Sequence, residues 1–292
     1  MQKVKYINPN GREMVIANSP PFILESISGI GAIGTQLITT AGAAQDGKSC
    51  HDVRLEDREI TVKFHIEGAS LADMYQQRRN AIRLTASTMH RNGKLGRLIY
   101  TNDYGSWQIP CMVKVGVNAD KRIKTFNHCT IIFYCPSPYW RSLQPDTERL
   151  TYLDAGLEFP LELDSELQIQ FGTRGYENVI YNYGDAPAPL KITITGPATQ
   201  PEIIKRSTGE FIRISRRELQ EGDKLYINTD PDNLEATIIR TNGTTEPAFG
   251  YVDLGTTFFL ADPGENKLEY QSGDDTTTAL VEIEAQSWFG GV

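Results

Sequence analysis

The sequence predicts a mainly β protein with two domains: an N-terminal β-sandwich or split-barrel-like domain that carries one α-helix, and a C-terminal antiparallel β-sandwich. Three observations support this prediction. Short runs of alternating apolar and polar residues recur along the chain, as at Leu190, Ile192 and Ile194, and such a period of two is typical of half-buried strands. Glycine, proline and asparagine separate these runs. A clear helical period is confined to one segment, residues 70–89.

The length and composition fit this organisation. A chain of 292 residues is long for one hydrophobic core and comfortable for two domains. Its 39% hydrophobic and 23% charged residues are ordinary for a globular protein. No apolar run approaches the roughly 20 residues that cross a bilayer, and the polar first residues contain no secretion signal. We therefore expect no membrane contact, and folding and assembly in the cytoplasm.

The two halves of the chain differ in charge. Residues 1–137 hold 17 lysine and arginine residues against 11 aspartate and glutamate residues, whereas residues 138–292 hold 12 against 26. This asymmetry and the Pro136–Trp140 segment, which interrupts the strand pattern, predict domains at 1–137 and 138–292. The basic excess is too small to predict nucleic-acid binding. Ordinary surface variation and charge-complementary contacts with other subunits or proteins both remain open.

Alternation places six strands in the first half. They are residues 13–17, 22–27, 55–67, 96–101, 106–117 and 123–135. His65 falls on the polar face of the third, where we expect a solvated side chain. The apolar face of the fifth is predicted to comprise Trp107, Ile109, Cys111, Val113, Val115 and Val117. Asn118-Ala119-Asp120 is the predicted hairpin turn before the last strand.

Residues 70–89 form the predicted helix. Ser70 is a favourable N-cap, and Asp73 completes a pair that is like a capping box. The segment Arg91-Asn92-Gly93 would end the helix. Side chains at helical spacing form one apolar face, which we expect to pack across a sheet. They are Leu71, Met74, Tyr75, Ile82, Thr85 and Met89.

Residues 29–47 are rich in glycine, with Gly29, Gly31 and Gly34 close together. The P-loop register of G-K-[ST] is missing and no helix is predicted to follow, so we reject a phosphate-binding loop. A twisted connector or arm between strands explains the glycines better. Our hypothesis is that Gly29–Gly47 becomes ordered only in an assembly.

Four cysteines, at 50, 111, 129 and 135, follow no C-x-x-C pattern, and we expect them to be reduced and buried. The alternative is a zinc site made of Cys50, His51, His128 and Cys129. Adjacent strand residues point to opposite faces and do not easily reach one ion. The sequence therefore predicts no metal and no cofactor.

The second half consists of short strands with turns between them, which predicts a sandwich. They are residues 167–171, 178–182, 190–195, a strand from Pro201, then 211–214, 225–227, 236–240, 257–260, 267–271 and 278–285. Residues 141–158 form a polar connector with weak strand character.

An enzymatic role finds no support in the sequence. Paired carboxylates could serve glycoside hydrolysis, but most acidic residues here lie in predicted turns or on outward faces. The candidates are Glu158, Glu162, Asp164, Glu166, Asp223, Asp230 and Asp232, and Asp274-Asp275 is a predicted turn. The cluster at residues 230–232 lacks the rest of a calcium loop. No G-x-S-x-G motif is present and no histidine follows His128. We expect no catalytic residues.

Two regions of the sequence resemble the distal tail proteins of siphoviruses. The first half has their order of strands, one helix and a long β-hairpin, and ends in Tyr134-Cys135-Pro136-Ser137-Pro138-Tyr139-Trp140. The second half has Asn182-Tyr183-Gly184-Asp185, a strand that ends in Ile194-Thr195-Gly196-Pro197-Ala198, and Thr208-Gly209-Glu210-Phe211-Ile212. The resemblance covers essentially the whole chain.

The resemblance implies a ring-forming first domain and a galectin-like second domain. The chain would form a homohexameric hub at the tail tip or baseplate of a long non-contractile phage tail, a prophage or a tail-like particle. Its helix and long hairpin would supply the contacts between subunits. The hub would join the tail tube and tape measure to a tail-associated lysin or fibre, and the second domains would hold receptor-binding proteins.

The sugar-binding motifs of true galectins are absent from the second half. An H-x-N-P-R strand cannot exist there because all four histidines precede residue 129, and Trp288 is followed by Phe289-Gly290-Gly291. Fold alone does not supply function. The alternatives are another β-rich tail-tube or baseplate adaptor protein and a non-catalytic carbohydrate-binding module.

Overall fold

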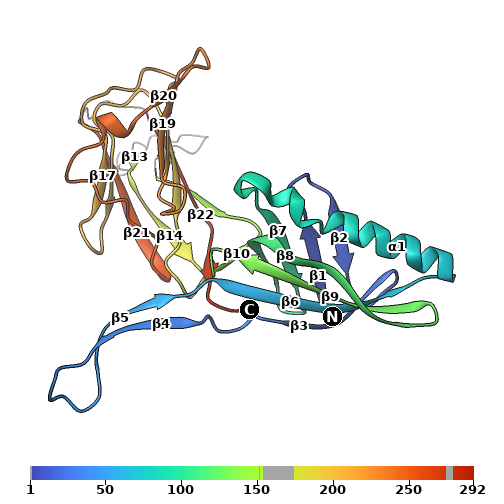
Figure 1. Ribbon diagram of the computed structural model, residues 1–292. Coiled ribbons are helices and arrows are strands. Elements are labelled where there is room, and N and C mark those ends of the chain that lie inside the picture. Colours follow the sequence, from blue (N-terminus) through green and yellow to red (C-terminus); the bar gives the residue numbers. More distant parts are fainter. Residues whose placement is uncertain (1, 151, 154–173, 274–278) are drawn as a thin grey trace, which may run out of the picture. The chain divides into compact units, whose positions relative to one another are not determined.

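The computed structural model describes residues 2–150, 152–153, 174–273 and 279–292 (Figure 1). The chain divides into two compact units: unit 1 comprises Met1–Leu143 with Phe289–Val292, and unit 2 comprises Gln144–Trp288. Trp140 is fully buried in the core of unit 1, so the proline-rich segment before it lies inside that unit. The polypeptide passes between the units twice.

Unit 1 is a bent, mostly antiparallel sheet. Its strands are β1 (Lys3–Ile7), β2 (Glu13–Ile16), β3 (Phe22–Ser28), β6 (Arg58–Glu67), β7 (Gly96–Thr101), β8 (Ser106–Ile123), β9 (Phe126–Cys135) and β10 (Trp140–Ser142). They follow the order β2-β1-β7-β8-β9-β6-β3, with β10 paired to β8. The first part of β8 pairs with β7 and its later part with β9. Ala17 bonds to Phe22 and Leu24, which brings β2 and β3 together and nearly closes a barrel.

Alternate residues of these strands fill the core of unit 1. Ile60, Val62, Phe64 and Ile66 of β6 are fully buried, as the alternation predicts. The predicted face of β8 is wrong at Val115, which is exposed because the β8–β9 register shifts between Val113 and Val115. A bulge of this kind turns the following side chain away from its expected face.

The hairpin turn lies further along than predicted. Strand β8 continues through Asn118 to Ile123, which pairs with Phe126, so Lys124 and Thr125 make the turn. Lys124 has a positive φ of 54°, the backbone region that tight hairpins require. The sequence did not predict this extension of β8, because residues 118–122 show no alternation of apolar and polar side chains.

Helix α1 spans Leu71–Leu84 and is followed by the 3₁₀ helix η1 (Ser87–Gly93). The N-cap prediction is confirmed, since the Ser70 hydroxyl accepts a hydrogen bond of 3.1 Å from the Asp73 backbone N–H. The predicted apolar face is only partly correct. Met74 and Thr85 are buried together with Ala81, whereas Leu71, Tyr75 and Ile82 are exposed. Met89 lies beyond α1, in η1, and is half-buried.

Replacing Ser70 with alanine is expected to destabilise unit 1 by about 1 kcal/mol, because a helix N–H loses its cap. Urea unfolding followed by circular dichroism would measure the change. Ser87→Ala is the matched control, since Ser87 lies outside α1 and is exposed. Equal effects of the two substitutions would contradict the assigned cap.

The glycine-rich region leads into a two-stranded hairpin. Strands β4 (Thr35–Thr40) and β5 (Ser49–Leu55) pair only with each other, and Figure 1 shows them reaching away from the rest of unit 1. We call residues 34–57 the hairpin arm. Leu55 belongs to β5, so the strand predicted at residues 55–67 begins instead at Arg58.

Unit 2 is an antiparallel β-sandwich. Its larger sheet has the order β11 (Asp146–Arg149), β22 (Leu280–Ala285), β15 (Leu190–Thr195), β18 (Lys224–Asn228), β19 (Glu235–Ile239) and β20 (Thr245–Pro247). Its smaller sheet has the order β14 (Glu177–Asn182), β21 (Gly264–Gln271), β16 (Glu202–Lys205) and β17 (Phe211–Arg213). The remaining elements of unit 2 are β12 (Tyr152–Leu153), β13 (Arg174–Gly175) and η2 (Phe249–Tyr251). Strand β23 (Trp288–Phe289) pairs with β10 and belongs to the nine-stranded sheet.

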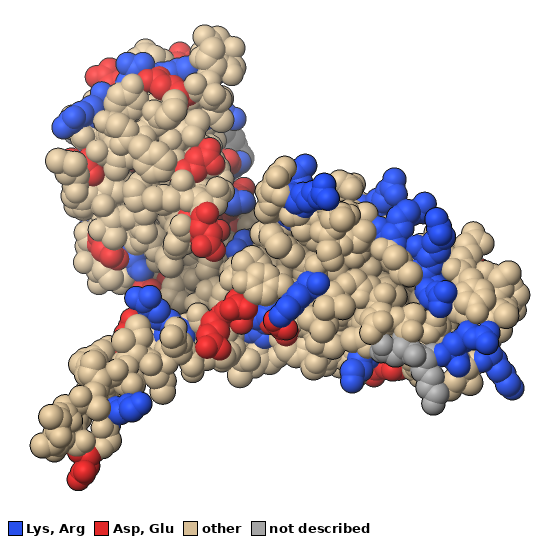
Figure 2. Space-filling view, viewed as in Figure 1, with Lys and Arg blue, Asp and Glu red and all other residues tan. Residues whose placement is uncertain are grey.

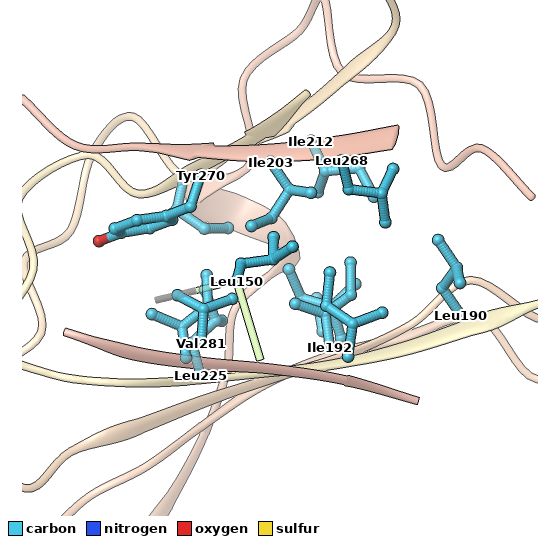
Figure 3. Close-up of a cluster of buried hydrophobic side chains, with 14 of the residues drawn as sticks. Leu150, Leu190, Ile192, Ile203, Ile212, Leu225, Leu268, Tyr270 and Val281 are labelled. Atoms are coloured by element: carbon cyan, nitrogen blue, oxygen red, sulfur yellow. The ribbon is translucent and has the colours of Figure 1, made fainter. Parts of the chain in front are cut away.

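The two sheets of unit 2 enclose one hydrophobic core. Figure 3 shows Ile203, Ile212 and Leu268 facing Ile192 and Val281 across it. The strand predicted from alternation at residues 190–195 is confirmed, and its buried side chains lie in this core.

Residues 257–260, predicted as a strand, are not one. An isolated β-bridge lies just beyond them, between Ala261 and Ala188. The strand predicted at 167–171 lies outside the described residues.

Candidate assembly interface

The hairpin arm has one apolar face that no other part of the described chain covers. In the β4–β5 register Leu37 lies opposite Val53 and Thr35 lies opposite Leu55, so these side chains share a face. Leu37, Val53 and Leu55 are 59%, 51% and 42% exposed. An isolated two-stranded hairpin is only marginally stable in water. The arm therefore gains stability from any surface that covers this face.

A buried arginine fastens the base of the arm. Arg58 begins β6, is 4% exposed, and donates to the carbonyl oxygens of Gly29 (2.6 Å) and Gly31 (2.7 Å), where the chain leaves for the arm. Its guanidinium also donates to the carbonyls of Pro138 (2.9 Å) and Gly290 (2.5 Å). Burial lowers the pKa of Arg58. One side chain thus joins four distant segments of unit 1, a role that the sequence did not reveal.

The outer side of α1 is a second uncovered apolar surface. Leu71, Tyr75 and Ile82 are 42%, 40% and 48% exposed and follow one another at helical spacing. Arg79 and Arg83 are exposed beside them. We call these five residues the outer face of α1. The sequence analysis identified Leu71, Tyr75 and Ile82 as apolar but assigned them wrongly to the core. The helix contacts the sheet along a narrow line, and this contact buries only Met74 and Ala81.

A carboxylate and two histidines meet on the outer side of β3, β6 and β9. His65 and His128 are directly opposite in the β6–β9 register, and Glu25 Oε1 lies 2.5 Å from His128 Nδ1 and 3.3 Å from His65 Nδ1. Glu25 is the extra residue where the β3–β6 register shifts, and bulges re-aim side chains in this way. His65 therefore has a protein partner and is not simply solvated as predicted.

The four residues of the zinc alternative are not brought together. Cys50 and His51 lie on the arm, where His51 Nε2 is 2.6 Å from Thr40 Oγ1, and Cys129 is buried while His128 faces outward. Across the described residues no group of three or more potential ligands is arranged to hold a metal ion. The prediction of buried cysteines is correct for three and wrong for Cys50, which is exposed. Burial raises the pKa of the Cys135 thiol to about 12.

Unit 2 has an open pocket of about 520 Å³ at one end of its larger sheet. Its lining is polar and comprises Thr199, Gln200, Ser215, Arg216, Arg217, Glu218, Gln220 and Arg240. Two of its cations are already paired with carboxylates, since Arg240 bonds to Asp223 (2.7 Å) and Glu246 (2.6 Å), and Arg217 bonds to Glu246 (3.3 Å). The pocket is thus largely neutralised from within.

Of the acidic candidates that the structure describes, Asp223 and Asp230 form hydrogen bonds within the fold. Burial alone would raise the pKa of Asp223, but hydrogen bonds from Arg240 and from two backbone N–H groups outweigh it and lower that pKa. Asp230 accepts a bond from the Asp232 backbone N–H within a turn. Glu158, Glu162, Asp164, Glu166 and the Asp274-Asp275 turn lie outside the described residues.

The stability of unit 2 is expected to fall in acid partly through Glu246. Hydrogen bonds from Tyr251 and Arg240 lower its pKa from 4.5 to about 2. A lowered carboxyl pKa stabilises the fold above the unfolded value, and this contribution is lost as pH falls through the folded value. Thermal melts should show a smaller loss between about pH 4.5 and pH 2 in Glu246→Gln than in the unaltered chain. Glu221→Gln, at an exposed position, is the control, and an unchanged slope in Glu246→Gln would contradict this assignment.

Two segments of the chain match known protein families. Residues 9–135 match the family model of the phage tail protein RIFT-related domain, and residues 183–283 match that of the siphovirus-type tail component, C-terminal domain. No curated protein sequence matches the chain. In the described residues no helix is long and apolar enough to cross a membrane.

Solved structures with a similar fold come from phage tails. The Dit (gp 19.1) protein of phage SPP1, described as a paradigm of the hub adsorption apparatus in phages that infect Gram-positive bacteria, aligns with a TM-score of 0.68 and 13% identity over 99% of each chain. A chain of the phage p2 baseplate in its activated conformation with strontium aligns with a TM-score of 0.55 and 13% identity over 100% of both chains. The same baseplate with calcium gives a TM-score of 0.55 and 14% identity over 100% of this chain and 99% of that one. At these identities the likeness concerns the fold.

The two matched segments together span most of the chain and define a phage tail protein built from two β domains. The chain belongs to the siphovirus-type distal tail protein family, as the resemblance predicted. It is a structural component of a siphovirus-type phage tail.

Proposed function

We propose that the chain forms a closed ring of six identical subunits that acts as the hub at the distal end of the tail. The uncovered apolar face of the hairpin arm carries this proposal, because a small hairpin with three exposed aliphatic side chains requires a partner surface. A ring of heterologous contacts supplies one such surface to every subunit and leaves no arm unused.

The ring would connect the tail tube and tape measure on one side with a tail-associated lysin or fibre on the other, and unit 2 would hold receptor-binding proteins. Assembly would take place in the host cytoplasm. The role is structural and not catalytic, in keeping with the hydrogen bonds of Asp223, Asp230 and Glu246 within the fold. The order of Gly29–Gly47 would depend on this assembly.

The mass of the purified chain in solution, with negative-stain images of the same sample, tests the proposal. We expect particles of six chains with a central hole. A 32.6-kDa monomer at every concentration would contradict the ring. A glycan array on the isolated chain would then test the alternative of a carbohydrate-binding module.

A further inference from the structure

The hairpin arm and the outer face of α1 have matching polarity and opposite charge. Both expose three large apolar side chains. Four acidic residues on the arm, Asp46, Asp52, Glu56 and Asp57, outnumber Lys48 and Arg54. Helix α1 carries Arg78, Arg79 and Arg83 against Asp73 alone, and Figure 2 shows basic side chains over the end of unit 1 that carries α1.

The charged residues of each surface are not all neutralised by neighbours on the same surface, so they can still attract the other surface. Arg54 lies 3.9 Å from Asp52, on the opposite face of the arm from Leu37 and Val53, so this pair is neutral and turned away. On α1, Asp73 is engaged at the helix start, where its carboxylate accepts from the Ala69 N–H. The arginines beside Ile82 therefore face solvent without a nearby acidic partner on the helix.

The two surfaces also match in length. The apolar stripe of α1 runs from Leu71 to Ile82, a rise of about 16 Å along the helix axis. Strand β4 has six residues and is about 20 Å long. A hairpin laid along the helix could therefore cover the whole stripe with its apolar face.

The arm and α1 lie at opposite ends of unit 1 (Figure 1), so a contact between them joins two copies. Two different surfaces at opposite ends make a heterologous contact, which repeats from copy to copy and closes a ring when the rotation allows it. Opposite charges favour this orientation over arm-to-arm or helix-to-helix pairing.

We propose that the hairpin arm of one copy docks on the outer face of α1 of the next copy. Leu37, Val53 and Leu55 cover Leu71, Tyr75 and Ile82, and the acidic residues at the arm base approach Arg79 and Arg83. This inference rests on the proposed ring and specifies which surfaces form it.

Mixing two variants tests the docking. Leu37→Asp damages only the arm and Ile82→Asp only the helix, and both positions are exposed, so each chain should fold, as circular dichroism would verify. We expect each variant alone to lose ring formation, with its association weakened at least about tenfold. The equimolar mixture should regain a two-chain species in analytical ultracentrifugation, because one intact arm still meets one intact helix. The matched controls Gln36→Asp and Gln77→Asp should keep their rings, because Gln36 lies on the other face of the arm and Gln77 lies about 140° around the helix from Ile82.

Covalent capture gives an independent readout. Cys50 is the exposed thiol of the arm and lies five residues nearer the tip than Leu55. With the arm base at Arg79 and Arg83, the tip reaches the start of α1, so Leu71→Cys under a mild added oxidant should give a ladder of two to six chains on a non-reducing gel. Gln77→Cys, about 120° around the helix from Leu71, should give none. Rings that persist in Leu37→Asp and Ile82→Asp, or a ring-forming Leu71→Cys chain that does not cross-link, would overturn the docking and leave the ring proposal intact. An unaltered chain that forms no ring would overturn both.

Discussion

Replacing Arg58 with methionine is expected to destabilise unit 1 by about 3–5 kcal/mol, one of the largest effects of any single substitution in this chain. Methionine keeps much of the side-chain volume but leaves the carbonyls of Gly29, Gly31, Pro138 and Gly290 without their donor. An unpaired carbonyl costs about 1–3 kcal/mol where it is buried and less where water can enter, as it can beside the exposed Gly29 and Gly31. Urea unfolding monitored by tryptophan fluorescence would measure the loss.

Arg54→Met is the matched control for this prediction, because Arg54 is an exposed arginine whose contact with Asp52 is 3.9 Å long. Exposed ion pairs contribute about 0–1 kcal/mol. Arg58→Lys should recover little, since an ammonium cannot present the guanidinium fork. An unfolding midpoint in Arg58→Met equal to that of Arg54→Met would show that the four hydrogen bonds do not hold unit 1 together.

Replacing Gly184 with alanine is expected to destabilise unit 2 by about 3 kcal/mol, at the upper end of the usual cost of overpacking. A Cβ on Gly184 would lie 1.9 Å from the carbonyl oxygen of Trp288. That oxygen accepts hydrogen bonds from the backbone N–H groups of Asp185 and Ala186, so moving it apart breaks both. Differential scanning calorimetry should show a lower melting temperature for the transition of unit 2.

Gly250→Ala provides the comparison for Gly184→Ala, because an added Cβ there meets no atom within 4 Å. It should change the melting temperature little. If Gly184→Ala melts as Gly250→Ala does, the close approach to Trp288 is not a constraint on the fold.

The Gly184 contact also explains part of the segment by which the family was identified. Asn182 donates from Nδ2 to the carbonyls of Ala186 and Ala261 and accepts the Gly184 N–H at Oδ1. Asparagine and glycine are thus required two positions apart, the first for its fully used amide and the second for its missing side chain. The sequence showed the pattern but not its distant partners, Ala261 and Trp288.

The sequence predicted most strands and the helix start because these depend on local alternation and on capping. It could not predict which apolar stripe of α1 is buried, since Met74 and Ile82 look equivalent until the sheet is placed against the helix. It also missed β1, although Val4 and Tyr6 alternate there with lysines, and the extension of β8, where polar residues mask the strand pattern. The assembly surfaces were not located either. Ile82 was assigned to the core, no buried or exposed face was predicted for Leu37 and Val53, and only the fold shows all three uncovered.

The return of residues Phe289–Val292 to unit 1 has a mechanical consequence for a tail-tip protein. A load applied to unit 2 reaches unit 1 along two covalent tethers, at Leu143–Gln144 and at Trp288–Phe289. The second tether is anchored by the Phe289 ring against Trp107, by Gly290 on Arg58, and by the Val292 N–H on the Ile30 carbonyl. Tension would therefore be shared between the two attachments and pass into the same arginine that fastens the hairpin arm.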